Sequence, residues 1–200
     1  MDYYTLTRSN KVNYEIKRSQ FIAICEKAST RDDAMSALAQ VRQHYPDARH
    51  HCWAYLLGSP FSPNTMASSD DGEPSGTAGK PILNVLQHSD IGNAIIVVVR
   101  YFGGIKLGAG GLIRSYSSAA QQVLDSASKT RFVAMLSATI ECSFAQEQYL
   151  RHLTLQHQGE VLSAEYQEQV VLRLQLPQAA LDSFKAQCSL NQWKIQLAVE

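Results

Sequence analysis

The sequence predicts an α+β protein of two domains, which we place at residues 1–130 and 131–200. The chain has 200 residues, of which 45% are hydrophobic, and this suffices for one large or two small cores. Segments with the two-residue period of strands alternate with segments of helical period, and no internal repeat or low-complexity tract interrupts them. A polar stretch at residues 125–131 marks the junction between the two domains.

The first domain should begin with two strands and a helix. Strands are expected at residues 12–16 and 21–25, because apolar and polar side chains alternate in the first of them and the second is largely apolar. Thr30 is followed by Asp33 at the spacing of a capping box, so a helix should start there and end before Pro46.

Apolar periodicity predicts four further elements in this domain. They are a strand at residues 51–57, a short helix at 82–88, a central strand at 94–99, where every residue is apolar, and a helix from about Leu112. Residues 58–81 are rich in Ser, Pro, Gly and Asp. We expect a long loop there, of the kind that is usually functional or mobile.

The second domain shows a β-α-β-β-α-β order of elements. The expected elements are a strand at 136–142, a helix at 145–157, strands at 160–166 and 169–176, a helix at 177–190 and a strand at 193–199. This order predicts a ferredoxin-like arrangement, in which two helices cover one face of a four-stranded sheet.

Composition limits the classes of function. The formal net charge is zero, so RNA binding would need a local patch of positive charge, and sequence-specific DNA binding is not expected. The four cysteines form no CxxC pair, which favours reduced thiols and a cytoplasmic location. No apolar run is long enough for a membrane span, and the first residues do not resemble a signal peptide.

The glycine-rich segment 100–114 is the strongest candidate for a binding site. It lies between the apolar strand and the next helix and contains five of the eleven glycines. Such a turn can direct backbone N–H groups at an anion, and the helix adds the positive end of its dipole. The glycines expected to supply these donors are Gly103, Gly104, Gly108, Gly110 and Gly111. The alternative is that they form tight turns only.

Cations and aromatic side chains accompany these glycines. Arg100, Lys106 and Arg114 would hold a phosphate of RNA, of a nucleotide or of a small ester. Tyr101 and Phe102 could stack on a base, although Phe102 could equally belong to the core.

An acidic segment and His51 complete the predicted cleft. Within residues 68–81 the candidates are Asp70, Asp71, Glu73, Gly76 and Thr77. Asp71 and Glu73 could act as acid and base, but the segment lacks the ligand alternation of a calcium loop, so we expect no metal and no cofactor. His51 is expected to face this cleft. Strand alternation separates His51 from His50 and Cys52, so the three should not share a metal ion.

Three motifs together resemble the YigZ/IMPACT family, and its bacterial YigZ branch in particular. They are DARHHC at Asp47–Cys52, SDDGEP with GTAGKP between Ser69 and Pro81, and VRYFGGIKLG with GGL between Val99 and Leu112. The resemblance spans nearly the whole chain. It implies an N-terminal domain of the two-layer α/β type seen in a small-subunit ribosomal protein and in domain IV of elongation factor G, followed by a ferredoxin-like domain.

The resemblance implies a non-enzymatic regulatory protein linked to translation or stress. Eukaryotic IMPACT proteins carry an RWD domain, not present in this sequence, and restrain the amino-acid-starvation kinase pathway through its ribosome-associated activator. The partner expected here is therefore RNA, the ribosome or a ribosome-associated protein. An enzyme acting on a phosphate ester or nucleotide is the alternative, since small-molecule kinases share this α/β type, and a protein-interaction adaptor is a third. The sequence does not indicate the oligomeric state.

Overall fold

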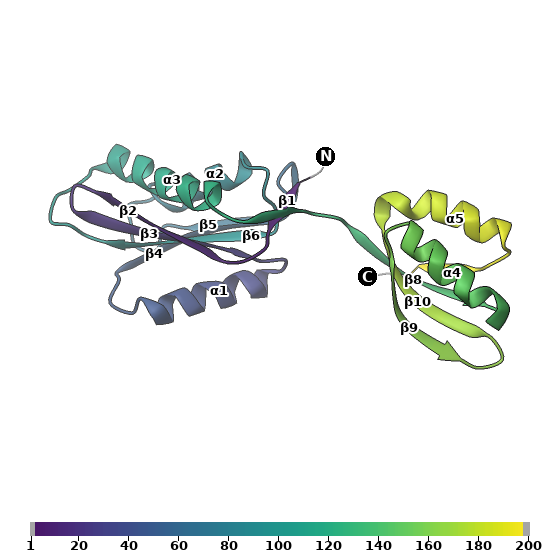
Figure 1. Ribbon diagram of the computed structural model, residues 1–200. Helices are drawn as coiled ribbons and strands as arrows, with labels where there is room; N and C mark the ends of the chain where they lie inside the picture. The colour runs from purple at the N-terminus through teal and green to yellow at the C-terminus, as the bar shows by residue number, and fades with distance from the viewer. Residues whose placement is uncertain (1–2, 198–200) are drawn as a thin grey trace. The chain divides into compact units, whose positions relative to one another are not determined.

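The computed structural model describes residues 3–197 and divides the chain into two compact units, Met1–Phe132 and Val133–Glu200 (Figure 1). The division falls two residues beyond the boundary expected from the sequence. The polar stretch at residues 125–131 belongs to the first unit, because β7 (Lys129–Arg131) returns to pair with β1 (Tyr4–Leu6) in a two-stranded sheet.

A five-stranded antiparallel sheet forms the centre of the first unit. In spatial order its strands are β2 (Asn10–Ile16), β3 (Ser19–Lys27), β6 (Ala94–Tyr101), β4 (His50–Ser59) and β5 (Ser62–Ser69). The central position of β6 agrees with its sequence, because its apolar residues from Ala94 to Val99 are all buried.

Helices cover both faces of this sheet, as Figure 1 shows: α1 (Arg31–His44) packs on one face, and α2 (Gly79–Gln87) and α3 (Ala109–Asp125) pack on the other. The unit therefore has three layers, and the expected two-layer arrangement is wrong. The apolar run of β6 explains the difference, since a strand that is apolar on both faces has to be covered on both.

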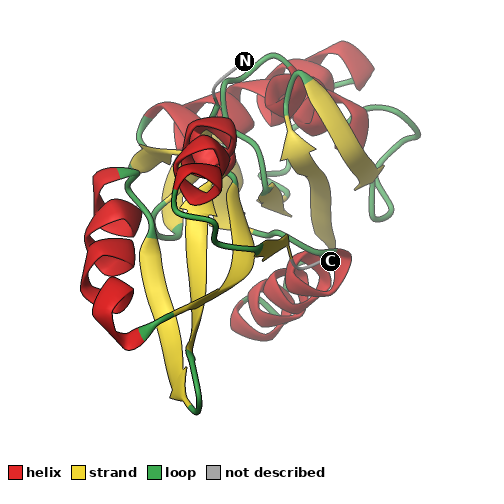
Figure 2. Ribbon diagram, turned by 90° about the vertical axis from the view of Figure 1, so that its right-hand side faces the viewer, coloured by secondary structure: helices red, strands yellow, loops and turns green. Residues whose placement is uncertain are grey.

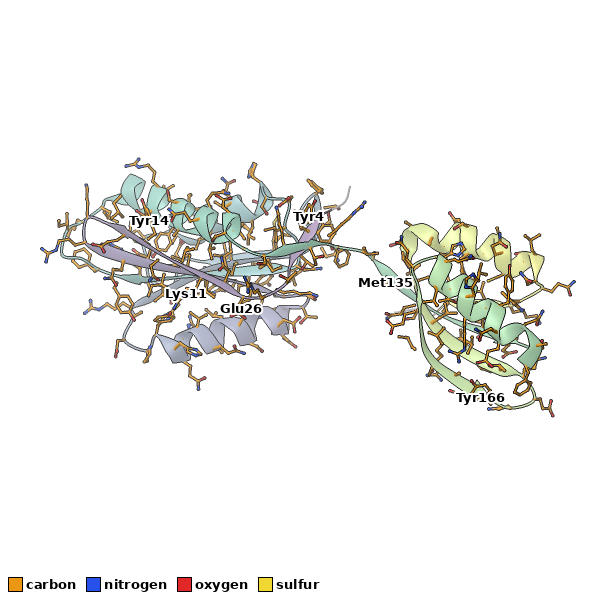
Figure 3. All side chains as sticks on the ribbon, viewed as in Figure 1. Tyr4, Lys11, Tyr14, Glu26, Met135 and Tyr166 are labelled. Atoms are coloured by element: carbon orange, nitrogen blue, oxygen red, sulfur yellow. The ribbon has the colours of Figure 1, made fainter. Side chains whose placement is uncertain are left out.

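The alternation of side chains assigns each residue of the sheet to one face. Tyr14 of β2 packs with the core beneath α3, whereas Lys11 of β2 and Glu26 of β3 lie on the α1 side (Figure 3). The capping box predicted for α1 is confirmed: the Asp33 backbone N–H donates to Thr30 Oγ1 at 3.1 Å, and the Thr30 N–H donates to Asp33 Oδ2 at 2.9 Å.

The expected loop at residues 58–81 is wrong over its first half. β4 extends to Ser59, and β5 runs back along it from Ser62 to Ser69, with a register shift at Gly58. β5 is an edge strand with an exposed polar face, so it lacks the apolar alternation by which strands are found, and an edge position also tolerates Pro63. Only the two-residue turn at 60–61 and the longer stretch 70–78 lie outside strands and helices, and the predicted short helix starts earlier than expected, at Gly79.

The second unit contains the predicted β-α-β-β-α-β order of elements. They are β8 (Met135–Cys142), α4 (Phe144–Gln156), β9 (Glu160–Tyr166), β10 (Val170–Pro177), a 3₁₀ turn η1 (Gln178–Ala180), α5 (Leu181–Leu190) and β11 (Ile195–Leu197). The strands lie antiparallel in the order β11-β8-β10-β9. Residues 198 and 199 of the last predicted strand lie outside the described residues.

One core joins both helices of the second unit to its sheet. It contains Leu150 and Leu153 from α4, Phe184 and Cys188 from α5, and alternating residues of β8 and β10 such as Leu172. Figure 2 shows the helices of each unit packed against its strands. Because all of these side chains belong to one buried cluster, α4 and α5 lie on the same face of the sheet.

Candidate functional site

A pocket of about 650 Å³ lies at one end of the sheet in the first unit. It is bounded by the start of β4, the end of β6, the acidic turn after β5 and the glycine-rich segment that leads into α3. The acidic, basic and histidine side chains that line it are Asp47, Arg49, His50, Glu73, Arg100 and Lys106. Its apolar wall is made by Pro74, Phe102, Leu107 and Leu112.

A buried ion pair forms the floor of this pocket. Arg100 Nη1 donates to Glu73 Oε1 at 2.6 Å, and the two side chains are 8% and 3% exposed. The Tyr116 hydroxyl of α3 donates to the same oxygen at 2.9 Å. The Arg100 guanidinium also lies 5.6 and 5.7 Å from the ring centres of Phe21 and Phe102. Sequence analysis expects Arg100 to hold phosphate, but in the structure Glu73 already neutralises its charge.

The groups behind this ion pair are held in their protonated forms. Burial raises the pKa of the Tyr116 hydroxyl far above its usual range, and Cys52 and Glu73 beside it act in the same direction, so this hydroxyl remains a donor. Burial raises the pKa of the Cys52 thiol to about 12, and its Sγ donates to the Tyr116 oxygen at 3.3 Å. Cys52 is therefore not a thiolate nucleophile at neutral pH.

Asp70 is used to build the acidic turn. Its carboxylate accepts N–H groups from Gly76, Ala78 and Gly79 at 2.7, 2.9 and 2.8 Å, which closes the turn onto the start of α2. Burial alone would raise the pKa of Asp70, but these three hydrogen bonds hold it below its usual value. The Thr77 hydroxyl donates to the Pro74 carbonyl at 2.6 Å in the same turn. Asp70, Gly76 and Thr77 do not line the pocket.

Asp71 faces α1 and not the pocket. One of its carboxylate oxygens accepts from Arg42 Nη2 at 2.9 Å, and the other accepts from the His51 backbone N–H at 2.7 Å. Both oxygens are thus engaged in fixing the turn to α1 and β4. The structure therefore does not place Asp71 in the pocket, where the sequence analysis offered it as an alternative acid or base.

The histidine that lines the pocket is His50, and the expectation that His51 would face the cleft is wrong. His51 is buried on the α1 side of β4, where its Nε2 lies 3.1 Å from the Tyr45 carbonyl oxygen and burial lowers its pKa. His50 points to the opposite face and lines the pocket. Its Nδ1 lies 2.9 Å from the Asp71 carbonyl oxygen, which can only accept, so Nδ1 carries the proton and Nε2 is the remaining ring nitrogen.

The glycines of the segment 100–114 have different structural roles. Gly103 packs against the backbone of Arg18, and its N–H donates to Ser19 Oγ at 3.2 Å. Gly104 and Gly108 adopt positive φ angles of 85° and 71°, which favour glycine. Gly108 is also the N-cap of α3. No side chain caps this end and its first turn contains no acidic residue, so the N-terminus of α3 has kept its positive character.

The pocket contains some of the residues predicted from the sequence but not others. Those that line it are Glu73, Arg100, Tyr101, Lys106 and Gly108. Those that lie outside it are His51, Asp70, Asp71, Gly76, Thr77, Gly103, Gly104, Gly110, Gly111 and Arg114. Arg114 nevertheless lies close by, because its Nη1 approaches Gly110 in the first turn of α3. Asp47, Arg49 and His50 lie in the DARHHC segment, and the alternation of β4 could have pointed to His50.

Two structural findings bear on the class of protein. Among residues 3–197, no group of three or more His, Cys, Asp or Glu side chains is placed to hold a metal ion. In the same part of the chain, no helix is long and apolar enough to cross a membrane.

Fold and site together define a two-unit α+β protein with a pocket in its first unit. Comparison with known proteins then gives the family. Residues 17–124 match the Impact N-terminal domain, and residues 140–187 match a domain of unknown function, DUF1949. This chain belongs to the IMPACT family.

Relatives in this family cover most of the chain. IMPACT family member YigZ of Escherichia coli is 40% identical over 172 residues, and an IMPACT family member of Haemophilus influenzae is 39% identical over 173. Each match spans 86% of this chain and 84% of the relative. A crystal structure described as that of a hypothetical protein is 36% identical, with a TM-score of 0.74 over 100% of this chain and 98% of the other.

Removal of the Glu73 carboxylate should lower the stability of the protein much more than removal of an exposed acid from the pocket rim. Glu73→Ala leaves the buried Arg100 charge without its partner, and we expect a loss of about 3–5 kcal/mol in the free energy of unfolding. Asp47→Ala is the matched control and should change it by less than about 0.5 kcal/mol. Urea denaturation measures both. Equal effects would show that the ion pair does not hold the pocket floor.

Gly103 and Gly104 should respond differently to the same substitution. A Cβ at Gly103 overlaps the backbone of Arg18 and Ser19, whereas a Cβ at Gly104 meets open space. We expect Gly103→Ala to cost about 3 kcal/mol and Gly104→Ala about 1 kcal/mol, the latter from its positive φ alone. Equilibrium unfolding gives both values, and a Gly103→Ala protein as stable as the wild type would disprove the close approach.

Proposed function

We propose that this chain is a non-enzymatic regulatory protein, linked to translation or stress, that binds single-stranded RNA in the pocket of its first unit, as free RNA or on the ribosome. The observation that carries the proposal is a pocket with a cationic rim and an apolar wall beside the uncapped N-terminus of α3. Membership of the IMPACT family favours a regulatory role.

The cations of the rim are available to an anion. Arg49 and Lys106 are exposed, and neither forms an ion pair with an acid within residues 3–197. The first turn of α3 adds the partial positive charge of a helix N-terminus, and Gly108 and Ala109 of this turn line the pocket. Phosphate oxygens match this set of donors.

The apolar wall suits an unpaired base. The side chain of Phe102 is 61% exposed, although a large apolar residue at the end of a buried strand would normally be covered. Aromatic side chains that stack on bases are typical of proteins that bind single strands, whereas a base within a duplex cannot reach such a wall. The pocket therefore favours an unpaired strand as the ligand.

The remaining assignments follow the same proposal. We assign the second unit to the ferredoxin-like type, which is supported by its element order and by the position of β10 between β8 and β9. We place the protein in the cytoplasm, a location supported by four buried cysteines that form no disulfide.

Charge reversal beside the pocket should remove RNA binding without unfolding the protein. Lys106→Glu with Arg114→Glu changes two exposed side chains, so the melting temperature should remain within a few degrees of the wild type. We expect the affinity for a short single-stranded RNA to fall at least about tenfold, measured by fluorescence anisotropy at low salt.

The matched control carries the same charge change at the other end of the sheet. Arg8→Glu with Lys27→Glu is suitable, because Lys27 pairs with Ala94 at the end of β6 remote from Arg100. This variant should bind RNA nearly as the wild type does. Unchanged affinity in the Lys106/Arg114 variant would contradict the site, whatever the control shows.

An enzyme acting on a phosphate ester or nucleotide is a second candidate, and His50 is the observation that favours it. With its proton on Nδ1, this side chain presents Nε2 as a possible base beside the cationic rim. Incubation of the protein with a panel of phosphate esters and nucleotides, with and without Mg²⁺, tests this candidate. Turnover that disappears in His50→Gln would establish this candidate. The absence of turnover would contradict it and favour the RNA-binding protein.

A further inference from the structure

The turn between β2 and β3 has an unusual composition for its conformation. Lys17 and Arg18 form this two-residue turn with φ angles of 47° and 64°. Hairpin turns with two positive φ angles strongly prefer Asn-Gly or Asp-Gly, because a Cβ is unfavourable there. Two long cationic side chains therefore occupy a place where the fold alone would select smaller residues. Such a departure from local preference is more often found at functional positions.

This turn lies against the glycine-rich segment. The Gly103 N–H donates to Ser19 Oγ, and a Cβ at Gly103 would overlap the Arg18 carbonyl group. Strand pairing also places the turn beside the end of β6, because Gln20 of β3 is opposite Tyr101 of β6. Tyr101 and Phe102 in turn line the pocket. The turn therefore borders the wall at which the pocket would receive a base.

The cations of this end of the unit outnumber its exposed acids, although the net charge of the whole chain is zero. The exposed cations are Lys17, Arg18, Arg49, Lys106 and Arg114. Glu15 and Asp47 are the exposed acids near them. Lys17 and Arg18 form no ion pair with an acid within residues 3–197. Exposed positive charge is thus present both at the pocket rim and at the turn that packs against Gly103.

We propose that the Lys17–Arg18 turn is a second phosphate-contact point of the RNA site. One unpaired base enters the pocket while the adjoining sugar-phosphate backbone crosses the turn, so the ligand is a strand of about four or more nucleotides and not a mononucleotide. This inference rests on the proposed function. It assigns a role to two residues that lie outside the pocket and outside the motifs of the glycine-rich segment.

Salt dependence distinguishes such a contact from a structural turn. Affinity falls as salt rises, and each phosphate neutralised on a single strand adds about 0.7 to the magnitude of the negative slope of log affinity against log salt concentration. Two cations at the turn should therefore contribute about 1.4 to this slope. A mononucleotide has no backbone beyond the pocket, so its binding should not depend on them.

Lys17→Asn with Arg18→Gly is the informative variant, because it removes both charges and supplies the residues that the turn prefers. We expect it to be at least as stable as the wild type, so a loss of affinity cannot come from unfolding. Its binding to an oligouridylate of about eight nucleotides is compared with that of uridine monophosphate between about 50 and 200 mM salt. Arg8→Gln with Lys27→Gln is the control of equal charge change.

The proposal predicts that the octamer binds the wild type more tightly than the monophosphate does. In the Lys17/Arg18 variant the octamer should lose about fivefold or more in affinity and about 1.4 in salt slope, with the monophosphate unaffected. The second contact alone would be overturned if this variant and the control had the same octamer affinity and salt slope. It would also be overturned if the wild type bound the octamer and the monophosphate with equal affinity. Absence of octamer binding by the wild type would overturn the proposed function as well.

Discussion

The ion pair between Arg100 and Glu73 joins three segments that are distant in the sequence. Arg100 is the penultimate residue of the central strand β6, Glu73 lies in the turn after β5, and Tyr116 brings α3 to the same carboxylate oxygen. A buried ion pair contributes little net stability, but its loss is costly because one charge would remain buried without a partner. Every arrangement in which the acidic turn moves away from the end of the sheet is therefore unfavourable. The pocket depends on this constraint, because the pair forms its floor.

The same ion pair divides the charges of the site into two groups. At the floor, the positive charge of Arg100 is matched by Glu73. At the rim, Arg49 and Lys106 are exposed, and the open N-terminus of α3 adds to their field. An anion is consequently attracted to the mouth of the pocket and its adjoining surface. The apolar wall lies next to these cations, which is the combination that a nucleotide unit of a single strand requires.

Local sequence signals predicted the elements that depend on local physics. The capping box of Thr30 and Asp33 located α1, and the run from Ala94 to Val99 located the central strand. That run also contained a signal that the two-layer expectation did not use, because β6 is apolar on both faces and needs a helix on each. β5 was missed since its polar sequence reflects an edge position, where hydrogen bonds to a single neighbour suffice.

Residues of the candidate site were harder to predict, because their roles depend on contacts between distant segments. The roles of Asp70 and Asp71 could not be read from composition, since short carboxylates in a turn serve equally well to bind backbone N–H groups or a ligand. The contact of Gly103 with Ser19 becomes visible only when the β2–β3 hairpin is brought beside the segment that follows β6. His50 could have been predicted from the sequence, because alternation along β4 places it on the face opposite His51.

The most direct test of the account is a titration of the isotope-labelled protein with single-stranded octamer RNA, followed through its backbone amide resonances. The account predicts that the largest changes occur at Gly108, Ala109 and Gly110 and at the neighbouring Phe102, with Leu38 and Val41 of α1 unchanged. Changes confined to the α1 face or to the second unit would contradict it.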